Sequence, residues 1–149
     1  MHIVLYKPDI PQNAAAIIRL SACLNLKLHL IEPCGFNLND SRFRRVVMDY
    51  MGLCKIIRHN DFSSFLEKYK KSRIVLMTTK ARKIYHKFKF KKNDMLLFGR
   101  ESAGVPNELH QILKNKIKIP MNKKTRSLNV AISVAIIAAE ALRQNNLLK

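Results

Sequence analysis

Short apolar runs alternate with helix-like stretches along the whole chain, and this alternation limits the possible folds more than any other feature. The first run, at 2–6, is followed by Pro11, a residue typical of the first turn of a helix. Strands that alternate with helices favour an α/β fold, in which a mostly parallel sheet carries helices on both faces. We predict strands at 2–6, 27–32, 54–58, 73–79, 95–98 and 117–120, and helices at 11–25, 39–51, 60–70, 106–113 and 128–144.

The chain has the size and composition of one globular domain. Its 149 residues are 48% hydrophobic and contain no repeat or linker, so we predict a single domain over 1–149. The longest apolar stretch, 130–139, is interrupted by Ser133 and is too short to cross a membrane, and the first residues lack a leader-like pattern. We therefore expect a cytoplasmic protein without a membrane partner. Its cysteines are expected to be reduced packing residues: Cys23, Cys34 and Cys54.

The charge is strongly positive and unevenly distributed. A net charge of +18 favours a polyanion as partner, most commonly a nucleic acid. The basic residues gather at 42–45, 80–92 and 114–126. We expect a mobile loop at 81–93, because this segment has no clear period. Part of the lysine content could reflect an AT-rich coding sequence, and charge by itself leaves RNA, DNA and an anionic membrane open. Aromatic residues interleave with the second basic group and suit stacking on unpaired bases: Tyr85, Phe88 and Phe90.

The last predicted helix, 128–144, is apolar on almost every side. A helix of this kind must be buried all round. In so small a chain a second subunit would supply the missing cover most easily, so we expect a homodimer. Close packing within one chain is the alternative.

No local pattern indicates a metal site or a familiar nucleophile. The five histidines are scattered without metal-ligand spacing, so we expect surface histidines and no bound metal. Neither a glycine-rich nucleotide loop nor a nucleophile-elbow motif is present.

Three segments stand where a predicted strand passes through a loop into a helix. They cover 11–19, 98–106 and 119–129. Ligands bind at the carboxyl ends of strands in open α/β sheets. The glycines at 99 and 104 would let the backbone approach a ligand closely. Each segment taken separately could be an ordinary turn with a helix cap.

At these segments the sequence resembles the SPOUT, or α/β-knot, RNA methyltransferases of the TrmH-like group. Asn13 to Arg19 resembles the first family motif, Phe98 to Pro106 the second and Ile119 to Asn129 the third. The resemblance covers essentially the whole chain. Within the family, the chain resembles most specifically the small single-domain branch that methylates the ribose 2′-oxygen of the tRNA wobble nucleotide. This more specific resemblance is carried by residues 3–13, 31–36, 49–50 and 78–80.

The resemblance implies an α/β fold with a deep C-terminal trefoil knot, a homodimer, S-adenosylmethionine as methyl donor and tRNA as partner. Carried onto this chain, it implies catalytic or ordering roles for Arg19, Asn13 and Glu101. It implies that the cofactor pocket is lined by Met77, Gly99, Ile119, Ser127, Leu128 and Asn129. It also implies that RNA is held by Lys7, Lys80, Arg82 and Arg126.

Arg19 has three possible roles. A guanidinium stays protonated, with a pKa above about 12, so we interpret Arg19 as a bidentate phosphate clamp that also stabilises developing alkoxide charge. A neutral arginine acting as base is the second possibility. The third is a structural Arg19 paired with Glu101.

The chain departs from the family pattern at several alanines. Residues 14–16 are alanine where the family usually has Thr-Gly-Asn, and Ala131 and Ala139 replace a serine and a tyrosine. Two alternatives therefore stay open. One is a ribose methyltransferase with another tRNA or rRNA target, and the other is a catalytically impaired, knotted RNA-binding protein.

Overall fold

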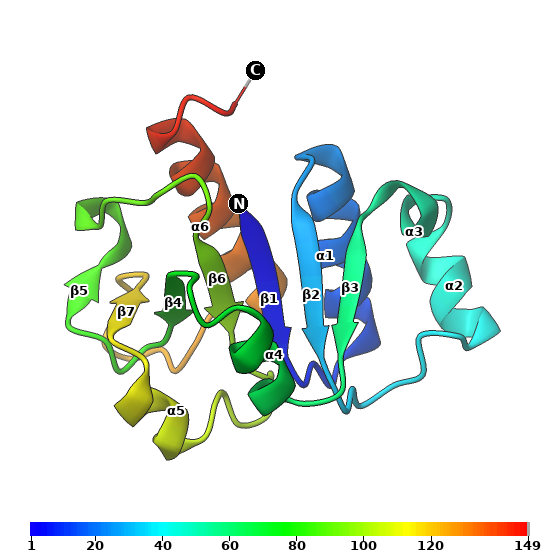
Figure 1. Cartoon of the computed structure of the whole chain (residues 1–149), viewed down its shortest axis with the longest axis horizontal. Helices are drawn as coiled ribbons and strands as arrows, with labels where there is room; N and C mark the ends of the chain where they lie inside the picture. The colour runs from blue at the N-terminus through cyan, green and yellow to red at the C-terminus, as the bar shows by residue number, and fades with distance from the viewer. Residues whose placement is uncertain (149) are drawn as a thin grey trace.

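The computed structural model describes residues 1–148 and contains one parallel sheet (Figure 1). Its strands lie in the order β3-β2-β1-β6-β4-β7-β5, and each pairing between neighbours is parallel. The predicted α/β fold is confirmed. The strands are β1 (His2–Tyr6), β2 (Lys27–Ile31), β3 (Ile56–His59), β4 (Ile74–Met77), β5 (Lys83–Ile84), β6 (Met95–Phe98) and β7 (Asn115–Lys118).

Helices cover both faces of the sheet, as predicted. Side chains alternate along each strand, so Ile3 and Leu5 of β1 pack in one core layer and Val4 packs in the other. The first layer is covered by α1 (Pro11–Cys23), α2 (Ser41–Val47), α3 (Tyr50–Leu53) and α6 (Val130–Gln144). The second is covered by α4 (Phe62–Lys68) and α5 (Asn107–Ile112).

The helix predicted at 39–51 is two short helices. Asp40 caps α2 by accepting a hydrogen bond of 2.7 Å from the backbone N–H of Arg42. Met48 then adopts a φ of 55°, a left-handed conformation that ends the helix, and α3 begins at Tyr50. The following strand begins at Ile56, two residues later than predicted.

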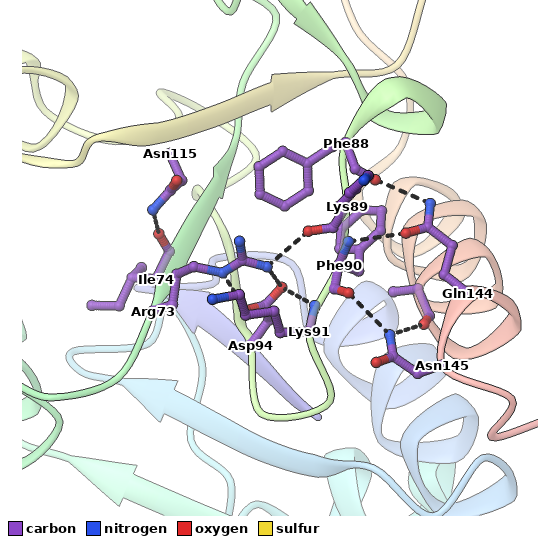
Figure 2. Close-up of polar contacts among 11 residues, drawn as sticks. Arg73, Ile74, Phe88, Lys89, Phe90, Lys91, Asp94, Asn115, Gln144 and Asn145 are labelled. Atoms are coloured by element: carbon purple, nitrogen blue, oxygen red, sulfur yellow. Dashed lines mark hydrogen bonds and ion pairs between the residues drawn. The ribbon is translucent and has the colours of Figure 1, made fainter.

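The segment 81–93 is anchored in the fold, and the expectation of a mobile loop was wrong. It contains β5, which pairs with β7, and a 3-10 turn at Tyr85–Lys87. Phe88 and Phe90 are buried in the core, so they are not free to stack on bases. The reason is non-local: the end of α6 binds the backbone of this segment (Figure 2).

The apolar helix α6 is buried on one side only. Val134, Ile137 and Ala138 lie in the core, whereas Ile132 is 54% exposed and Ala139 is also exposed. Packing within one chain therefore leaves part of its apolar surface uncovered. The homodimer stays a prediction.

Three histidines, expected as separate surface residues, form a row across β1, β2 and β3, in which His29 and His59 are buried and His2 is half-buried. His29 Nε2 lies 2.8 Å from Nδ1 of His2, and His29 Nδ1 lies 3.0 Å from Nε2 of His59. Phe65 and Tyr69 stand edge-on to the ring of His29. Burial, then the neighbouring imidazoles and lysines, lowers the pKa of His29 to about 3. Burial and nearby positive charge lower the pKa of His2 to about 4.

Acid should destabilise the fold through this row. The folded chain keeps these imidazoles neutral below their ordinary pKa of 6.5, so the unfolded chain binds more protons. The free energy of unfolding should therefore fall as pH drops below about 6.5, by up to about 1.4 kcal/mol per pH unit for His29. Urea unfolding at several pH values checks this. His29→Gln should flatten the dependence whatever its own stability, and equal slopes in both proteins would rule out the row as the cause.

No helix within residues 1–148 is long and apolar enough to cross a membrane. The cysteines are free thiols with different surroundings. Cys54 is buried in the core and Cys34 is half-buried, but Cys23 is exposed on α1. The predicted packing role is therefore wrong for Cys23.

Candidate active site

A cavity of about 500 Å³ opens at the carboxyl ends of β4, β6 and β7. Met77, Phe98 and Lys118 end these strands and line it. Asn13 from the start of α1 and Val130 from the start of α6 complete the wall. Since ligands bind at the carboxyl ends of strands in open α/β sheets, the fold locates the candidate site here.

Two glycines shape the loop that follows β6. Arg100 and Gly104 exchange backbone hydrogen bonds of 3.0 and 2.8 Å, which fold residues 100–104 into a tight loop. Gly104 has a φ of 69°, a conformation that favours glycine. A Cβ on Gly99 would lie 2.5 Å from the carbonyl carbon of Gly104. The close approach predicted from these glycines is therefore made by the loop's own backbone.

A chain of hydrogen bonds joins the three loops around the cavity. The Glu101 carboxylate accepts a bond of 3.0 Å from Asn13 Nδ2, and Asn13 Oδ1 accepts a bond of 2.8 Å from Asn129 Nδ2. Asn129 Oδ1 in turn accepts the backbone N–H of Ala131 at 2.8 Å and caps α6. One polar network thus links the starts of α1 and α6 to the loop after β6.

Asp9 fixes this loop from the end of β1, and the sequence analysis missed it. Asp9 and Glu101 bond reciprocally, since the backbone N–H of each donates to the carboxylate of the other, at 3.0 and 3.1 Å. Asp9 Oδ2 also accepts bonds from Arg100 and Ser102. The neighbouring Glu101, then Ser102 and Arg100, hold the pKa of Asp9 well below its usual value. The sequence feature that could have pointed to Asp9 is its position three residues after the end of β1.

Most of the predicted site residues lie around the cavity. Asn13 and Glu101 line it together with the residues predicted to hold the cofactor and one predicted to hold RNA: Met77, Gly99, Ile119, Ser127, Leu128, Asn129 and Lys80. Further lining residues were not predicted, although several follow strand ends directly: Ile10, Thr78, Thr79, His110, Lys118 and Ser133.

Arg19 lies apart from this group, as do Lys7, Arg82 and Arg126, which are absent from the lining of the cavity. The guanidinium of Arg19 lies over the ring of Tyr50, 4.9 Å from its centre, on the exposed side of α1. Glu101 is bonded to Asp9 and Asn13, so the structural Arg19–Glu101 pair considered from the sequence was wrong.

The lining suits a small organic ligand with polar ends. It offers apolar side chains, backbone groups at strand ends and the amides of Asn13 and Asn129. Within residues 1–148 no group of three or more histidine, cysteine, aspartate or glutamate side chains is arranged to hold a metal ion.

The parallel sheet, the cavity at its strand ends and the strong positive charge are typical of the class of α/β proteins that bind a small ligand and a polyanion. Comparison with known proteins narrows this class. The SpoU rRNA Methylase family matches residues 1–139. A tRNA (cytidine(34)-2'-O)-methyltransferase from Ancylobacter novellus is 46% identical over 145 residues, which cover 95% of this chain and 91% of the relative. The chain belongs to the SpoU rRNA Methylase family.

Solved structures agree with this assignment. One that concerns the 2-OH methylation of C/U34 on tRNA has a TM-score of 0.93 and 38% identity, over 97% of this chain and 95% of that chain. An AdoMet-bound rRNA methyltransferase from Sinorhizobium meliloti has a TM-score of 0.86 over 99% of this chain and 57% of that chain, and its 24% identity shows the fold alone. The predicted SPOUT family is confirmed, whereas the trefoil knot stays a prediction.

Proposed function

We propose that this chain is a tRNA methyltransferase that transfers a methyl group from S-adenosylmethionine to the ribose 2′-oxygen of the wobble nucleotide, cytidine or uridine 34. The proposal rests mainly on one observation: a relative and a solved structure described with this reaction match nearly the whole chain, at 46% and 38% identity. The polar network around the cavity supports an intact site over an impaired one.

The cavity fits the cofactor by size and by the kind of groups that line it. Met77, Ile119 and Leu128 offer apolar contact, while the backbone of Gly99, the hydroxyl of Ser127 and the amide of Asn129 offer polar contact. Bound there, S-adenosylmethionine would supply an already activated sulfonium methyl group. The protein needs no metal for this chemistry.

Besides binding the cofactor, the protein must align the ribose hydroxyl and help it lose a proton. Alignment can supply much of the acceleration. Asn13 and Glu101 order the site through their mutual hydrogen bond. Lys80, on the wall of the cavity, would hold RNA directly. Lys7, Arg82 and Arg126 would contact RNA outside the cavity.

Arg19 needs a second copy of the chain to reach a site. It lies six residues after Asn13 on α1, about 120° away around the helix, and its guanidinium lies over Tyr50 and outside the lining of its own cavity. We therefore propose a homodimer in which the exposed faces of α1 and α6 meet and Arg19 serves the partner's site. Ile132 and Ala139 would be covered in that dimer.

The remaining features of the proposal follow from the family. Residues 1–149 form one SPOUT domain, and its C-terminal part passes through a trefoil knot. The strand order, with β4 between β6 and β7, is compatible with such a crossing. A tRNA substrate would place the protein in the cytoplasm.

Gly99→Ala should weaken cofactor binding. The added Cβ would meet the backbone of Gly104, which cannot rotate away as a side chain could, so the loop at 100–104 must shift. An overpacked site costs about 1–3 kcal/mol, or roughly 5- to 150-fold in affinity. Calorimetric titration with S-adenosylmethionine measures the change. Gly52→Ala is the matched control because its Cβ would meet nothing within 4 Å, and equal affinities in the two variants would contradict the assignment.

Methyl transfer tests the proposed function directly. The purified chain is incubated with labelled S-adenosylmethionine and tRNA that lacks ribose methylation, and the labelled nucleotide is mapped. Label on the wobble ribose is the expected result. Label elsewhere would replace the target by another tRNA or rRNA position. A folded, RNA-binding chain that transfers no label would be the impaired protein.

A further inference from the structure

The segment between β4 and β6 is hydrogen-bonded to the end of α6 through the side chain of Gln144. The amide of this side chain pairs with the backbone of the segment as a neighbouring strand would. Gln144 Nε2 donates to the backbone carbonyl of Phe88 at 3.0 Å, and Gln144 Oε1 accepts the backbone N–H of Phe90 at 2.9 Å (Figure 2). Asn145 Nδ2 donates to the carbonyl of Phe90 at 3.4 Å. The backbone of this segment is therefore fixed at Phe88 and at Phe90.

An ion pair with a buried carboxylate holds the same segment from its other side. Arg73 bonds both oxygens of Asp94 at 2.6 Å and donates to the carbonyl of Lys89 at 2.9 Å (Figure 2). Asp94 also accepts the backbone N–H of Lys91 at 2.8 Å. The Arg73 guanidinium lies 5.0 Å from the centre of the Phe88 ring. These contacts set which side of the segment faces the core.

The segment therefore has one side that faces the core and one side that faces solvent. The rings of Phe88 and Phe90 point into the core, and the side chains between and beside them are exposed and positive. None of the ion pairs formed within residues 1–148 uses these exposed side chains. We call this surface the basic ridge; it consists of Arg82, Lys83, Lys87, Lys89, Lys91 and Lys92.

The basic ridge begins beside the cavity at β5 and runs to the start of β6, at the opposite end of the strands. Lys83 and Ile84 of β5 pair with Ile117 and Lys118 of β7, and these two residues line the cavity. An RNA that places one nucleotide in the cavity can therefore extend along the ridge. Cations that form no ion pair within residues 1–148, with His86 as the one exposed ring among them, fit phosphates better than bases.

We propose that the basic ridge is a preformed contact surface for the phosphate backbone of tRNA, separate from the site that holds the reacting nucleotide. This proposal rests on the proposed function, since it takes tRNA as the substrate. The ridge binds the RNA phosphate backbone whatever the nucleotide sequence. It thereby adds to the affinity for tRNA that comes from contacts with the wobble nucleotide. Its anchors fix the backbone that carries the cations before RNA arrives.

A charge-matched pair of variants tests the ridge. The ridge variant is Lys87→Gln/Lys89→Gln/Lys91→Gln, whose side chains make none of the anchoring bonds. The control is Lys68→Gln/Lys70→Gln/Lys71→Gln, which removes the same charge at the end of α4, on the other face of the sheet. Affinity for whole tRNA is measured for both at several salt concentrations, together with thermal melting and S-adenosylmethionine binding.

The ridge variant should bind tRNA about tenfold or more weakly than the control. Its salt dependence, the slope of log K against log salt, should fall by about 2–3 because each lost phosphate contact removes roughly 0.9. Melting and cofactor binding should be unchanged. Equal tRNA affinity and slope in the two variants would overturn the ridge. Failure of the wild-type chain to methylate tRNA would instead overturn the proposed function, which the binding assay does not use.

Discussion

Arg19→Ala should lower kcat for methyl transfer by about 10²–10³-fold, the usual effect of removing a group that stabilises developing charge. The guanidinium can bind a phosphate through two bonds while it stabilises the alkoxide that forms. S-adenosylmethionine affinity and thermal melting should hardly change, because Arg19 is exposed and lies outside the cavity of its own chain. Single-turnover kinetics with saturating tRNA measure this effect.

Subunit mixing shows which chain supplies Arg19. Arg19→Ala and Gly99→Ala chains are each impaired as homodimers. A mixed dimer contains one complete site if Arg19 acts across the interface, so co-expression should restore roughly a quarter of wild-type activity. If activity stays at the level of the separate variants, Arg19 does not act in the partner's site.

Arg73→Ala should lower the free energy of unfolding by about 3–5 kcal/mol, the usual cost of breaking a buried ion pair on one side. The substitution leaves the Asp94 carboxylate, 1% exposed, without its guanidinium. It also removes the bond to the Lys89 carbonyl and the contact with the Phe88 ring. Urea unfolding of the purified chain measures the change.

A double variant separates a lost charge partner from lost packing. Arg73→Met/Asp94→Asn keeps an oxygen for the backbone N–H of Lys91 but leaves no buried charge. It should be more stable than Arg73→Ala. An Arg73→Ala chain as stable as wild type would mean that the ion pair does not anchor the segment.

Local patterns predicted the fold well. β1, β2 and β6 are short apolar runs and Pro11 marks the start of α1, so periodicity and helix-start signals located these elements to within a few residues. The three strand-loop-helix segments were predicted to carry the site, and the structure brings Asn13, Glu101 and Asn129 of these segments into one network. The position of Arg19 could also have been predicted, because side chains six residues apart point about 120° apart around a helix.

The misses have non-local causes. Phe88 and Phe90 alternate with lysine, a pattern that suits an exposed stacking surface as well as a one-sided buried segment, and Gln144, more than 50 residues away, decides between them. His2, His29 and His59 meet only through the register of three parallel strands. The spacing of these residues in the sequence indicates neither the contact of Gln144 with the segment nor the contacts among the three histidines.

The most direct test of the central claim compares two tRNA substrates that differ by one oxygen. One carries an ordinary ribose at nucleotide 34, and the other carries 2′-deoxyribose there. Wild-type chain with labelled S-adenosylmethionine should label the first and leave the second unlabelled. Equal labelling of both would contradict methylation of the wobble 2′-oxygen.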